Sequence, residues 1–383
     1  MEEINPARRG ETLWRVLLGW YHHHGRILPW RQWQKDSDKA YKIWVSEVML
    51  QQTTVPVVIP YYRQFLRQFP TLASLASASR DRVLVAWQGL GYYRRAHHMH
   101  EAARMVMREH GGRFPRNERA LMSLPGIGAY TASALCVFAF GMRSMPLDGN
   151  IIRVMARLYC FGEPLPLSAQ GCNRLRAHAD ACMPPVGTRD AGAHAYGEMV
   201  HALMDFASTV CKAAAPLCDV CVLRPFCRAY QGGCVSSYPV RVKKKRRPCR
   251  HAIFFWVQNR RGDYLVYKRA QRGLLAGLLE CPSTPWQTGA WDDDSWRAHV
   301  PCDGAWSLCA ESFIHVFTHF TLYGRLAYCR RMMREGELSM AVGAAPWRWI
   351  ASGDEACYAF STLMRKIKAH KERYGPAIDM FSP

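Results

Sequence analysis

Four closely spaced cysteines constrain this chain more than any other feature of its sequence. In the stretch CKAAAPLCDVCVLRPFC (211–227), six, two and five residues separate Cys211, Cys218, Cys221 and Cys227. Such a cluster can be a disulfide framework, a zinc site or an iron–sulfur site. Each of these would hold together a short loop that has no regular apolar pattern of its own.

The N-terminal sequence argues against disulfides. It carries Glu2 and Glu3 and no long apolar run, so we expect neither a secretory signal nor a transit peptide. No segment reaches the roughly 20 apolar residues that a membrane span requires. We therefore expect no membrane association and a reducing compartment, which is the cytoplasm, with nucleoid association, if the source is bacterial. Thiols stay free there, so clustered cysteines indicate a metal site.

The spacing of the cysteines favours iron and sulfur over zinc. Structural zinc sites usually join two close cysteine pairs from separate loops, whereas this cluster contains one C-x2-C pair. Four thiolates within 17 residues, on a single loop after a helical segment, suit one [4Fe–4S] cluster better. Zinc remains the alternative on spacing alone.

The charge balance predicts a polyanionic partner. The 383 residues include 51 Lys and Arg against 30 Asp and Glu, a net charge of +21, which favours nucleic acid. Because 49% of the residues are hydrophobic and 13 are Trp, the chain can bury sizeable cores, and its length suggests two or three domains. Composition therefore favours an enzyme acting on nucleic acid over a passive binder.

Two hydrophobic patterns divide the sequence. Up to about residue 230, apolar residues recur at helical spacing in segments such as YKIWVSEVMLQQ and NIIRVMARLY. Beyond that point, HAIFFWV and YLVYKR predict a β-hairpin, 312–329 predicts a second pair of strands, and 361–374 predicts an amphipathic helix. The predicted fold class is a multidomain chain with an all-α region followed by a smaller α+β domain.

A basic linker separates the two regions. The stretch YPVRVKKKRRPCR (238–250) has seven basic residues among its last ten, no acid, and prolines near both ends. We therefore predict three parts. They are an all-α region over 1–230 that ends in the cysteine loop, a linker over 231–250, and the α+β domain over 251–383.

The motif MSLPGIGAYTASAL (122–135) predicts a helix–hairpin–helix. Its Leu-Pro-Gly-Ile-Gly turn lies between helical segments, and Gly126 and Gly128 permit a tight turn with exposed backbone N–H groups. Such a turn before a helix binds phosphate without a cationic side chain. An ordinary corner between two helices is the alternative.

Two carboxylates in separate motifs suggest acid–base chemistry. Glu47 stands among apolar neighbours in IWVSEVMLQQ, and Asp148 precedes a helix in MPLDGNIIRV. Taken alone, Asp148 could be an N-cap and Glu47 a solvent-facing residue. Beside a DNA-binding hairpin, the pair resembles an acid and an electrostatic stabiliser for breaking a glycosidic bond. Burial would have to raise the pKa of Glu47 to ~6–7 for it to serve as the acid.

Six motifs in order resemble those of the helix–hairpin–helix DNA glycosylases, and most closely the MutY-type adenine glycosylases, over nearly the whole chain. They are LPWR, YKIWVSEVMLQQT, WQGLGYYRRA, LPGIGAYTA, LDGNIIRV and the cysteine cluster. The resemblance implies a monofunctional enzyme, expected to be a monomer, that flips and removes adenine opposite 8-oxoguanine or guanine in double-stranded DNA. It also implies one [4Fe–4S] cluster on the four cysteines and a MutT-like C-terminal domain.

The same resemblance implies roles for individual residues. Glu47 would protonate the adenine and Asp148 would stabilise the sugar at C1′, with Tyr130 and Asn150 completing the catalytic set. The residues that resemble the adenine pocket are Arg26, Leu28, Trp30, Arg31 and Leu50. The residues that resemble DNA contacts are Gln52, Thr53, Tyr92, Gly126 and Gly128. Of these, Gln52 and Tyr92 resemble side chains inserted into the base stack.

The C-terminal domain resembles a module that binds 8-oxoguanine. Its FTHF stretch supplies Phe317, Thr318 and His319, where the family has Phe-Ser-His. Thr318 keeps the hydroxyl of serine and adds a methyl group. An active MutT-type pyrophosphatase is the alternative, but that enzyme needs a helical carboxylate cluster to hold metal, and no such cluster follows Glu280.

Two further alternatives concern the whole chain. An endonuclease III-like lyase would form a Schiff base with a lysine just after the hairpin, where this chain has Tyr130 and no lysine from Ile43 through Cys211. A non-enzymatic, metal-stapled DNA-binding protein would explain the charge and the cysteines. It would not explain Glu47 and Asp148 in their two motifs.

His201 departs from the family pattern. It lies ten residues before Cys211, where the family tends to carry a carboxylate or an amide that faces the adenine. A contact with the base and a solvent-facing position on a helix are both open for this residue.

Overall fold

The structure is a computed structural model that describes residues 12–32, 36–187, 194–242, 247–259, 261–271, 273–292, 294–329 and 347–375. The chain folds into two compact units, Met1–Ser77 with Glu101–Lys244, and Ala78–His100 with Lys245–Pro383. Residues 243–246 of the predicted linker lie outside the described residues. The three-part division drawn from the sequence stays a prediction. None of the described helices is long and apolar enough to cross a membrane.

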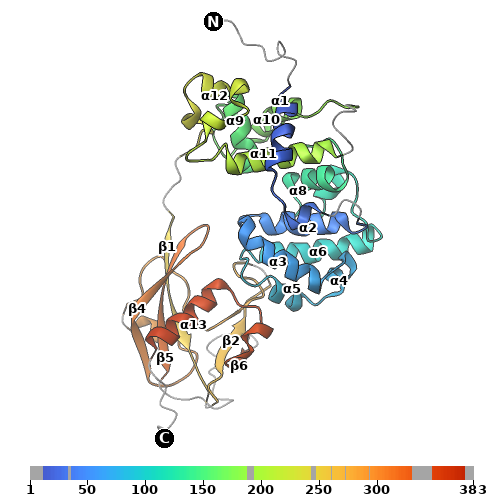
Figure 1. The fold of residues 1–383 in the computed structure, drawn as a ribbon. Helices are drawn as coiled ribbons and strands as arrows, with labels where there is room; N and C mark the ends of the chain where they lie inside the picture. Colours follow the sequence, from blue (N-terminus) through green and yellow to red (C-terminus); the bar gives the residue numbers. More distant parts are fainter. Residues whose placement is uncertain are drawn as a thin grey trace. The chain divides into compact units, whose positions relative to one another are not determined.

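The first unit is built of helices, as the sequence predicts (Figure 1). The helices that lie wholly within it are α1 (Leu13–His24), α2 (Lys39–Leu50), α3 (Val55–Gln68), α4 (Leu72–Ser77), α7 (Glu118–Met122), α8 (Ala129–Ala134), α9 (Gly149–Tyr159), α10 (Ala169–Ala181), α11 (Ala195–Thr209) and α12 (Arg228–Gln231). α11 packs against α1 and α9, and α2 packs against α3 and α8. These contacts bring α2, which carries Glu47, against α8, which carries Tyr130.

Local sequence explains where the site-bearing helix α9 begins and ends. Asp148 caps its N-terminus, and Cys160 ends it with a left-handed backbone (φ 51°). Between them, Ile151, Val154 and Leu158 are buried at helical spacing. At roughly 1.5–3 kcal/mol for each fully buried aliphatic side chain, this face fixes α9 against its neighbours.

The second unit contains two three-stranded sheets and α13 (Thr362–Tyr374). In one sheet β1 (Cys249–Trp256) pairs in parallel with β5 (Thr321–Cys329), which pairs antiparallel with β4 (Trp306–Val316). In the other, β2 (Tyr264–Lys268) lies between β3 (Leu279–Glu280) and β6 (Trp347–Ile350). The predicted strand pair within 312–329 and the predicted final helix are confirmed.

The predicted hairpin over HAIFFWV and YLVYKR is wrong beyond its turn. Near the turn the two segments pair antiparallel, with Leu265 N donating to Val257 O at 3.0 Å and Asn259 N to Asp263 O at 2.9 Å, but β1 and β2 then enter different sheets. The physical reason is that β1 is apolar on both faces. Phe254 belongs to one hydrophobic core and its neighbour Phe255 to the other. A strand buried on both faces does not stay on a two-stranded ribbon.

Residues 78–100 fold with the C-terminal strands, which the sequence pattern did not indicate. This segment contains α5 (Arg80–Ala86) and the start of α6 (Arg94–Glu109). The buried Tyr93 donates its hydroxyl proton to Phe360 O at 2.8 Å, and Lys268 Nζ lies 2.7 Å from an oxygen of Asp81. The second unit therefore includes the glycine-rich WQGLGYYRRA motif.

Candidate active site

Glu47 is held in an apolar environment by α2. Every residue of this helix from Ile43 to Met49 is buried, and Glu47 is 6% exposed. Tyr130 Oη donates a hydrogen bond of 2.9 Å to Glu47 Oε2. Burial raises the pKa of Glu47 to about 7, although the bond from Tyr130 and the charge of Arg31 lower it. A carboxyl group with that pKa still carries its proton in a large fraction of molecules at neutral pH, as a general acid must.

Asp148 is the N-cap of α9, while its role as an electrostatic stabiliser stays a prediction. As the N-cap of α9, its Oδ1 accepts from Asn150 N at 3.0 Å and from Ile151 N at 2.7 Å. Its Oδ2 accepts from Asn150 Nδ2 at 2.9 Å. Burial raises the pKa of Asp148, while these hydrogen bonds lower it. The three donors therefore hold the carboxylate in one orientation.

The predicted catalytic residues form one site. Tyr130 lies on α8, and its pKa is raised well above its ordinary value by burial and by the charges of Glu47 and Asp148. The charge of Asp148 also raises the pKa of Glu47. Asn150 joins through its hydrogen bond to Asp148. The fold thus brings a proton donor and an oriented carboxylate to one place.

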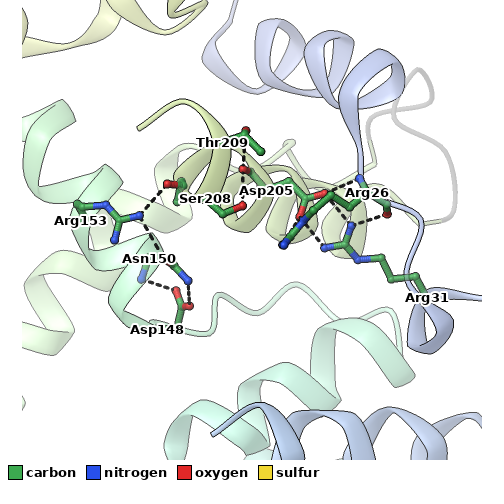
Figure 2. A network of polar contacts seen from close by, with 9 residues as sticks. Arg26, Arg31, Asp148, Asn150, Arg153, Asp205, Ser208 and Thr209 are labelled. Atoms are coloured by element: carbon green, nitrogen blue, oxygen red, sulfur yellow. Dashed lines mark hydrogen bonds and ion pairs between the residues drawn. The ribbon is translucent and has the colours of Figure 1, made fainter. Parts of the chain in front are cut away.

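Asp205 on α11 holds the two arginines expected in the base pocket (Figure 2). Arg26 donates from its backbone N at 2.8 Å and from Nε at 2.7 Å. Arg31 forms a bidentate pair, with Nη1 and Nη2 at 2.8 and 2.9 Å from the two oxygens. Asp205 is fully buried, and the two arginines hold its pKa below the ordinary value despite that burial. Sequence reasoning missed Asp205, although its apolar setting in HALMDFASTV is the signal that singled out Glu47.

A pocket opens beside Glu47 in the first unit. It is lined by Trp30, Arg31, Lys39, Ile43, Ser46, Glu47, Phe138 and His201. Of the predicted adenine-binding residues, Trp30 and Arg31 line it. Leu28 is buried just before the 3-10 turn Pro29–Arg31, and Leu50 ends α2, and neither is among the lining residues. His201, which is half-buried, also lines the pocket.

The turn between α7 and α8 has the geometry expected of a helix–hairpin–helix. Gly126 adopts a positive φ of 75°, which favours glycine. Gly128 is the N-cap residue of α8, and a Cβ atom added to it would meet no protein atom within 4 Å. The backbone at this helix start therefore stays accessible to a close ligand.

The two residues predicted to enter the base stack both have strained backbones. Gln52 has a φ of 61° and Tyr92 a φ of 48°, and such values are uncommon for residues other than glycine. Both side chains are exposed, and Thr53 next to Gln52 is half-buried. Strain of this kind costs of order 1–3 kcal/mol and clusters at functional sites.

The cysteine loop surrounds one hollow in the first unit. Its lining includes all four predicted cysteines, Cys211, Cys218, Cys221 and Cys227, together with the apolar side chains of Val210, Leu217 and Val235. Arg157 of α9 fixes the start of the loop. Its guanidinium donates to Cys211 Sγ at 3.3 Å, to Lys212 O at 2.7 Å and to Ala213 O at 3.1 Å. A buried cation beside the first thiol stabilises negative charge there.

This donor set fits a cluster better than a single ion. Among the described residues, no three His, Cys, Asp or Glu side chains are close enough together to hold one metal ion. A single zinc would need its sulfurs to meet around one point. In a [4Fe–4S] cluster each iron takes one cysteine, so the four thiols surround the group instead. Four thiols around one apolar hollow meet that requirement.

A polar chain runs from the carboxylate site to the cysteine loop, and Figure 2 shows its first part, from Asp148 through Asn150 to Arg153. Arg153 Nη2 donates to Asn150 Oδ1 at 3.1 Å and to Ala207 O at 2.8 Å, while its Nε donates to Cys211 O at 2.8 Å. Because Asn150 also bonds Asp148, two residues, Asn150 and Arg153, connect this carboxylate to the backbone of the first loop cysteine. One of the three hydrogen bonds that orient Asp148 thus belongs to a network that reaches the cysteine loop.

The predicted 8-oxoguanine loop is the tight turn between β4 and β5 of the second unit. Phe317 N donates to Phe320 O at 2.9 Å, and the Phe317 ring packs on Phe320 with centroids 4.8 Å apart. Thr318 and His319 are exposed at its tip. Within the same unit, Thr318 Oγ1 donates to Tyr92 Oη at 3.1 Å. The structure thus joins a predicted base-reading residue to a predicted intercalating one.

Glu280 is already paired in the second unit. It is 1% exposed on β3 and forms an ion pair with Arg269.

Comparison with known proteins matches both units. Residues 45–169 match the HhH-GPD superfamily of base excision DNA repair proteins, and residues 253–370 match the NUDIX domain. The first match contains Glu47, Asp148 and the helix–hairpin–helix turn. The second contains both sheets of the second unit, except for residues 249–252 at the start of β1.

Relatives match over most of the chain. It is 31% identical to the adenine DNA glycosylase of Homo sapiens, over 92% of this chain and 72% of that protein. It is 38% identical to the adenine DNA glycosylase of Mycolicibacterium smegmatis, over 70% of this chain and 80% of that protein. Among solved structures, a thermostable thymine-DNA glycosylase shares 27% identity and a TM-score of 0.50, over 57% of this chain and 95% of that one.

Proposed function

This chain belongs to the adenine DNA glycosylase family, and on that premise we propose that it removes adenine mispaired with 8-oxoguanine or guanine from double-stranded DNA. It is an adenine-specific DNA N-glycosylase of base excision repair. The observation that supports the finer proposal is the partly buried hydrogen bond between Tyr130 and Glu47, together with the fixed orientation of Asp148.

In the proposed reaction, Glu47 gives its proton to the departing adenine. A pKa of about 7 keeps that proton available, and Tyr130 orients the carboxyl group. Asp148 faces the sugar, whose transition state carries positive charge at C1′, and Asn150 holds its carboxylate in place. Water then adds at C1′ to leave an abasic site.

The DNA-binding part of the proposal uses three surfaces. Gly126 and Gly128 present backbone N–H groups to a phosphate. Gln52 and Tyr92 enter the base stack beside Thr53, which lowers the cost of extruding the adenine. The flipped base is bound by Arg26, Leu28, Trp30, Arg31 and Leu50. We further propose that the protein acts as a monomer in the cytoplasm.

One [4Fe–4S] cluster is proposed on Cys211, Cys218, Cys221 and Cys227. When bound it would supply rigidity to the loop, not a step of the glycosidic chemistry. Arg157 and Arg153 contribute by holding the backbone of Cys211, which supports Asn150 and through it Asp148. The basic residues of the loop then face phosphate.

The test uses duplexes that carry adenine opposite 8-oxoguanine, guanine, thymine or cytosine. We expect base release opposite 8-oxoguanine and guanine, seen as strand cleavage only after alkali. Glu47→Gln should bind the same duplexes and release nothing. Wild-type release from Glu47→Gln would contradict the role given to this residue.

The same assay separates the alternatives. Cleavage without alkali, or a borohydride-trapped adduct, would indicate a bifunctional lyase. Lys39 lines the pocket, but it lies eight residues before Glu47 on α2, roughly 12 Å along the helix axis, so we expect no adduct. Tight binding without base release would indicate a non-enzymatic DNA-binding protein.

A further inference from the structure

Trp286 of the second unit packs against Phe317, the residue that begins the turn between β4 and β5. The two ring centroids lie 5.7 Å apart, with an angle of 35° between the planes. Two further ring contacts of Phe317, with His315 at 4.5 Å and with Phe320 at 4.8 Å, come from the same hairpin and move with it. Trp286 belongs to a separate segment after β3, so its contact holds the turn relative to the rest of the domain.

The position of Trp286 is itself fixed by several contacts. Its indole Nε1 donates to Ser283 Oγ at 3.3 Å. The next residue, Gln287, exchanges two backbone hydrogen bonds with His251 of β1, at 2.7 and 3.2 Å. The half-buried indole also meets the ring of the core residue Phe254 edge-on, with centroids 6.2 Å apart. Trp286 is therefore anchored to β1 and to the core beneath it.

An ion pair with a buried carboxylate restrains the indole further. The guanidinium of Arg269 lies over this ring, 5.3 Å from the centroid. Glu280, which is 1% exposed, pairs with Arg269, and Arg269 Nε also donates to Leu274 O at 3.1 Å. Such a pair is weak evidence for stability, because the loss of hydration offsets much of the attraction. It does hold the guanidinium in one place, and cation–π attraction then restrains the ring of Trp286.

These contacts end at the exposed tip of the turn. Thr318 and His319 follow Phe317 directly and are exposed, whereas Phe317 and Trp286 both pack against the same hydrophobic core. Hydrogen bonds weaken steeply when their geometry is poor, so a turn that reads a base through one or two of them gains from being ordered beforehand. Packing between Phe317 and Trp286 supplies that order from inside the domain.

We propose that Trp286 is a positioning residue for the discrimination of 8-oxoguanine from guanine, acting through Phe317 on the tip of the turn. This inference rests on the proposed function and deepens it. Trp286 does not contact the base in this proposal. Its loss should lower the preference between the two bases without changing the chemistry that removes adenine.

The test measures single-turnover release of adenine opposite 8-oxoguanine and opposite guanine in the same duplex sequence, and takes the ratio of the two rates as the preference. We expect Trp286→Leu to lower this preference roughly 3- to 10-fold, the change expected when one or two side chains must be ordered on binding. Release opposite guanine should stay near the wild-type rate. Trp286→Phe keeps a ring against Phe317 and should recover most of the preference.

Trp291→Leu is the matched control. It also removes a half-buried tryptophan of the second unit, but one that packs against the other hydrophobic core. We expect this variant to keep the preference. If Trp286→Leu melts early, Trp286→Met carries the same comparison, because its flexible side chain fills more of the space and has no ring.

A double-mutant cycle separates positioning from a direct contact with DNA. In a chain that already carries Thr318→Ala and His319→Ala, Trp286→Leu should lower the preference no further, because the groups it positions are gone. A further loss in that background, or full preference in Trp286→Leu alone, overturns this inference and leaves the proposed function intact. If the wild-type protein shows no preference for 8-oxoguanine, the proposed reading of this base fails, and the inference fails with it.

Discussion

Tyr130 donates the hydrogen bond that Glu47 accepts at 2.9 Å, across 83 residues of sequence. This bond lowers the pKa of Glu47, while burial raises it to about 7. The carboxyl group is therefore near the midpoint of its titration at neutral pH. The pH dependence of base release becomes a direct measure of this one contact.

We expect the single-turnover rate of adenine release to fall about tenfold for each pH unit above the pKa of Glu47, because the proton to be transferred is then lost. Tyr130→Phe removes a hydrogen bond that lowers this pKa, so its midpoint should move to higher pH while its plateau rate drops. Rates from about pH 5.5 to 9 measure both effects. An unchanged midpoint in Tyr130→Phe would show that Glu47 is not the titrating acid.

Glu47 should also make stability depend on pH. Its pKa rises from 4.5 to about 7 on folding, so the folded state binds the proton more tightly. The stabilisation that this gives is full below pH 4.5 and is lost as the pH rises through about 7, a change of about 3 kcal/mol. Glu47→Gln does not titrate, so it should melt above wild type at alkaline pH and not at acidic pH. Glu101→Gln, at an exposed position of α6, is the matched control.

Local patterns predicted most of the fold, and non-local pairing accounts for what they missed. The spacing of apolar residues predicted an all-α first region, a strand pair within 312–329 and a helix over 361–374, because such spacing is set by local sequence. The same pattern could not tell that β1 pairs with β5, which lies some 70 residues later. Nor could it place residues 78–100 with the C-terminal strands, since the hydrogen bond of Tyr93 to Phe360 spans 267 residues.

For the candidate site too, the sequence predicted the residues that stand in short motifs and missed the contacts between distant parts of the chain. Glu47, Tyr130 and Asp148 stand in short motifs, so residue type and neighbours were enough to select them. The contacts of Asp205 with the two arginines join residues 174 and 179 positions apart, and no local pattern records such a pairing. The stack of His201 on Phe138 likewise depends on a π-helical turn whose sequence looks like an ordinary buried helix.

Asp148→Asn should separate chemistry from helix capping. Asparagine caps helices as well as aspartate, so this variant should keep its melting temperature and its affinity for DNA while adenine release slows at least ~100-fold. Asp148→Ala should lose the same activity and also about 1 kcal/mol of stability, because Asn150 N and Ile151 N lose their acceptor.

Ser168→Ala is the matched control for the capping effect. Ser168 caps α10 by accepting from Gly171 N at 3.0 Å, away from the pocket residues. We expect this variant to melt like Asp148→Ala and to release adenine like wild type. Wild-type activity in Asp148→Asn would show that the reaction does not need the negative charge of Asp148.

Iron content tests the cysteine loop. Protein purified without oxygen should be yellow-brown and contain about four irons per chain. Cys218→Ser should lose iron and weaken DNA binding or folding, whereas Cys172→Ser on α10, outside the hollow, should keep both. One equivalent of zinc without iron, measured by elemental analysis, would contradict the cluster.

Discrimination of 8-oxoguanine from guanine should depend on the contact between Thr318 and Tyr92. Thr318 Oγ1 lies 3.1 Å from Tyr92 Oη, so the residue proposed to read the base also positions one proposed to enter the stack. A truncation after Ser237 would remove Phe360, the partner of Tyr93, and would disturb the 78–100 segment as well. The test therefore uses Thr318→Ala combined with His319→Ala in the full-length chain.

The two bases differ by one oxygen and one N–H, which one or two hydrogen bonds can distinguish. We expect the double variant to lose roughly 10- to 100-fold of its preference for adenine opposite 8-oxoguanine, while release opposite guanine stays near the wild-type rate. Ser312→Ala, at an exposed position of β4, is the matched control and should keep the preference. If the double variant kept the full preference, the reading of 8-oxoguanine would have to be assigned outside this turn. Tyr92 would then be the first residue to vary, since it contacts the turn and carries the strained backbone.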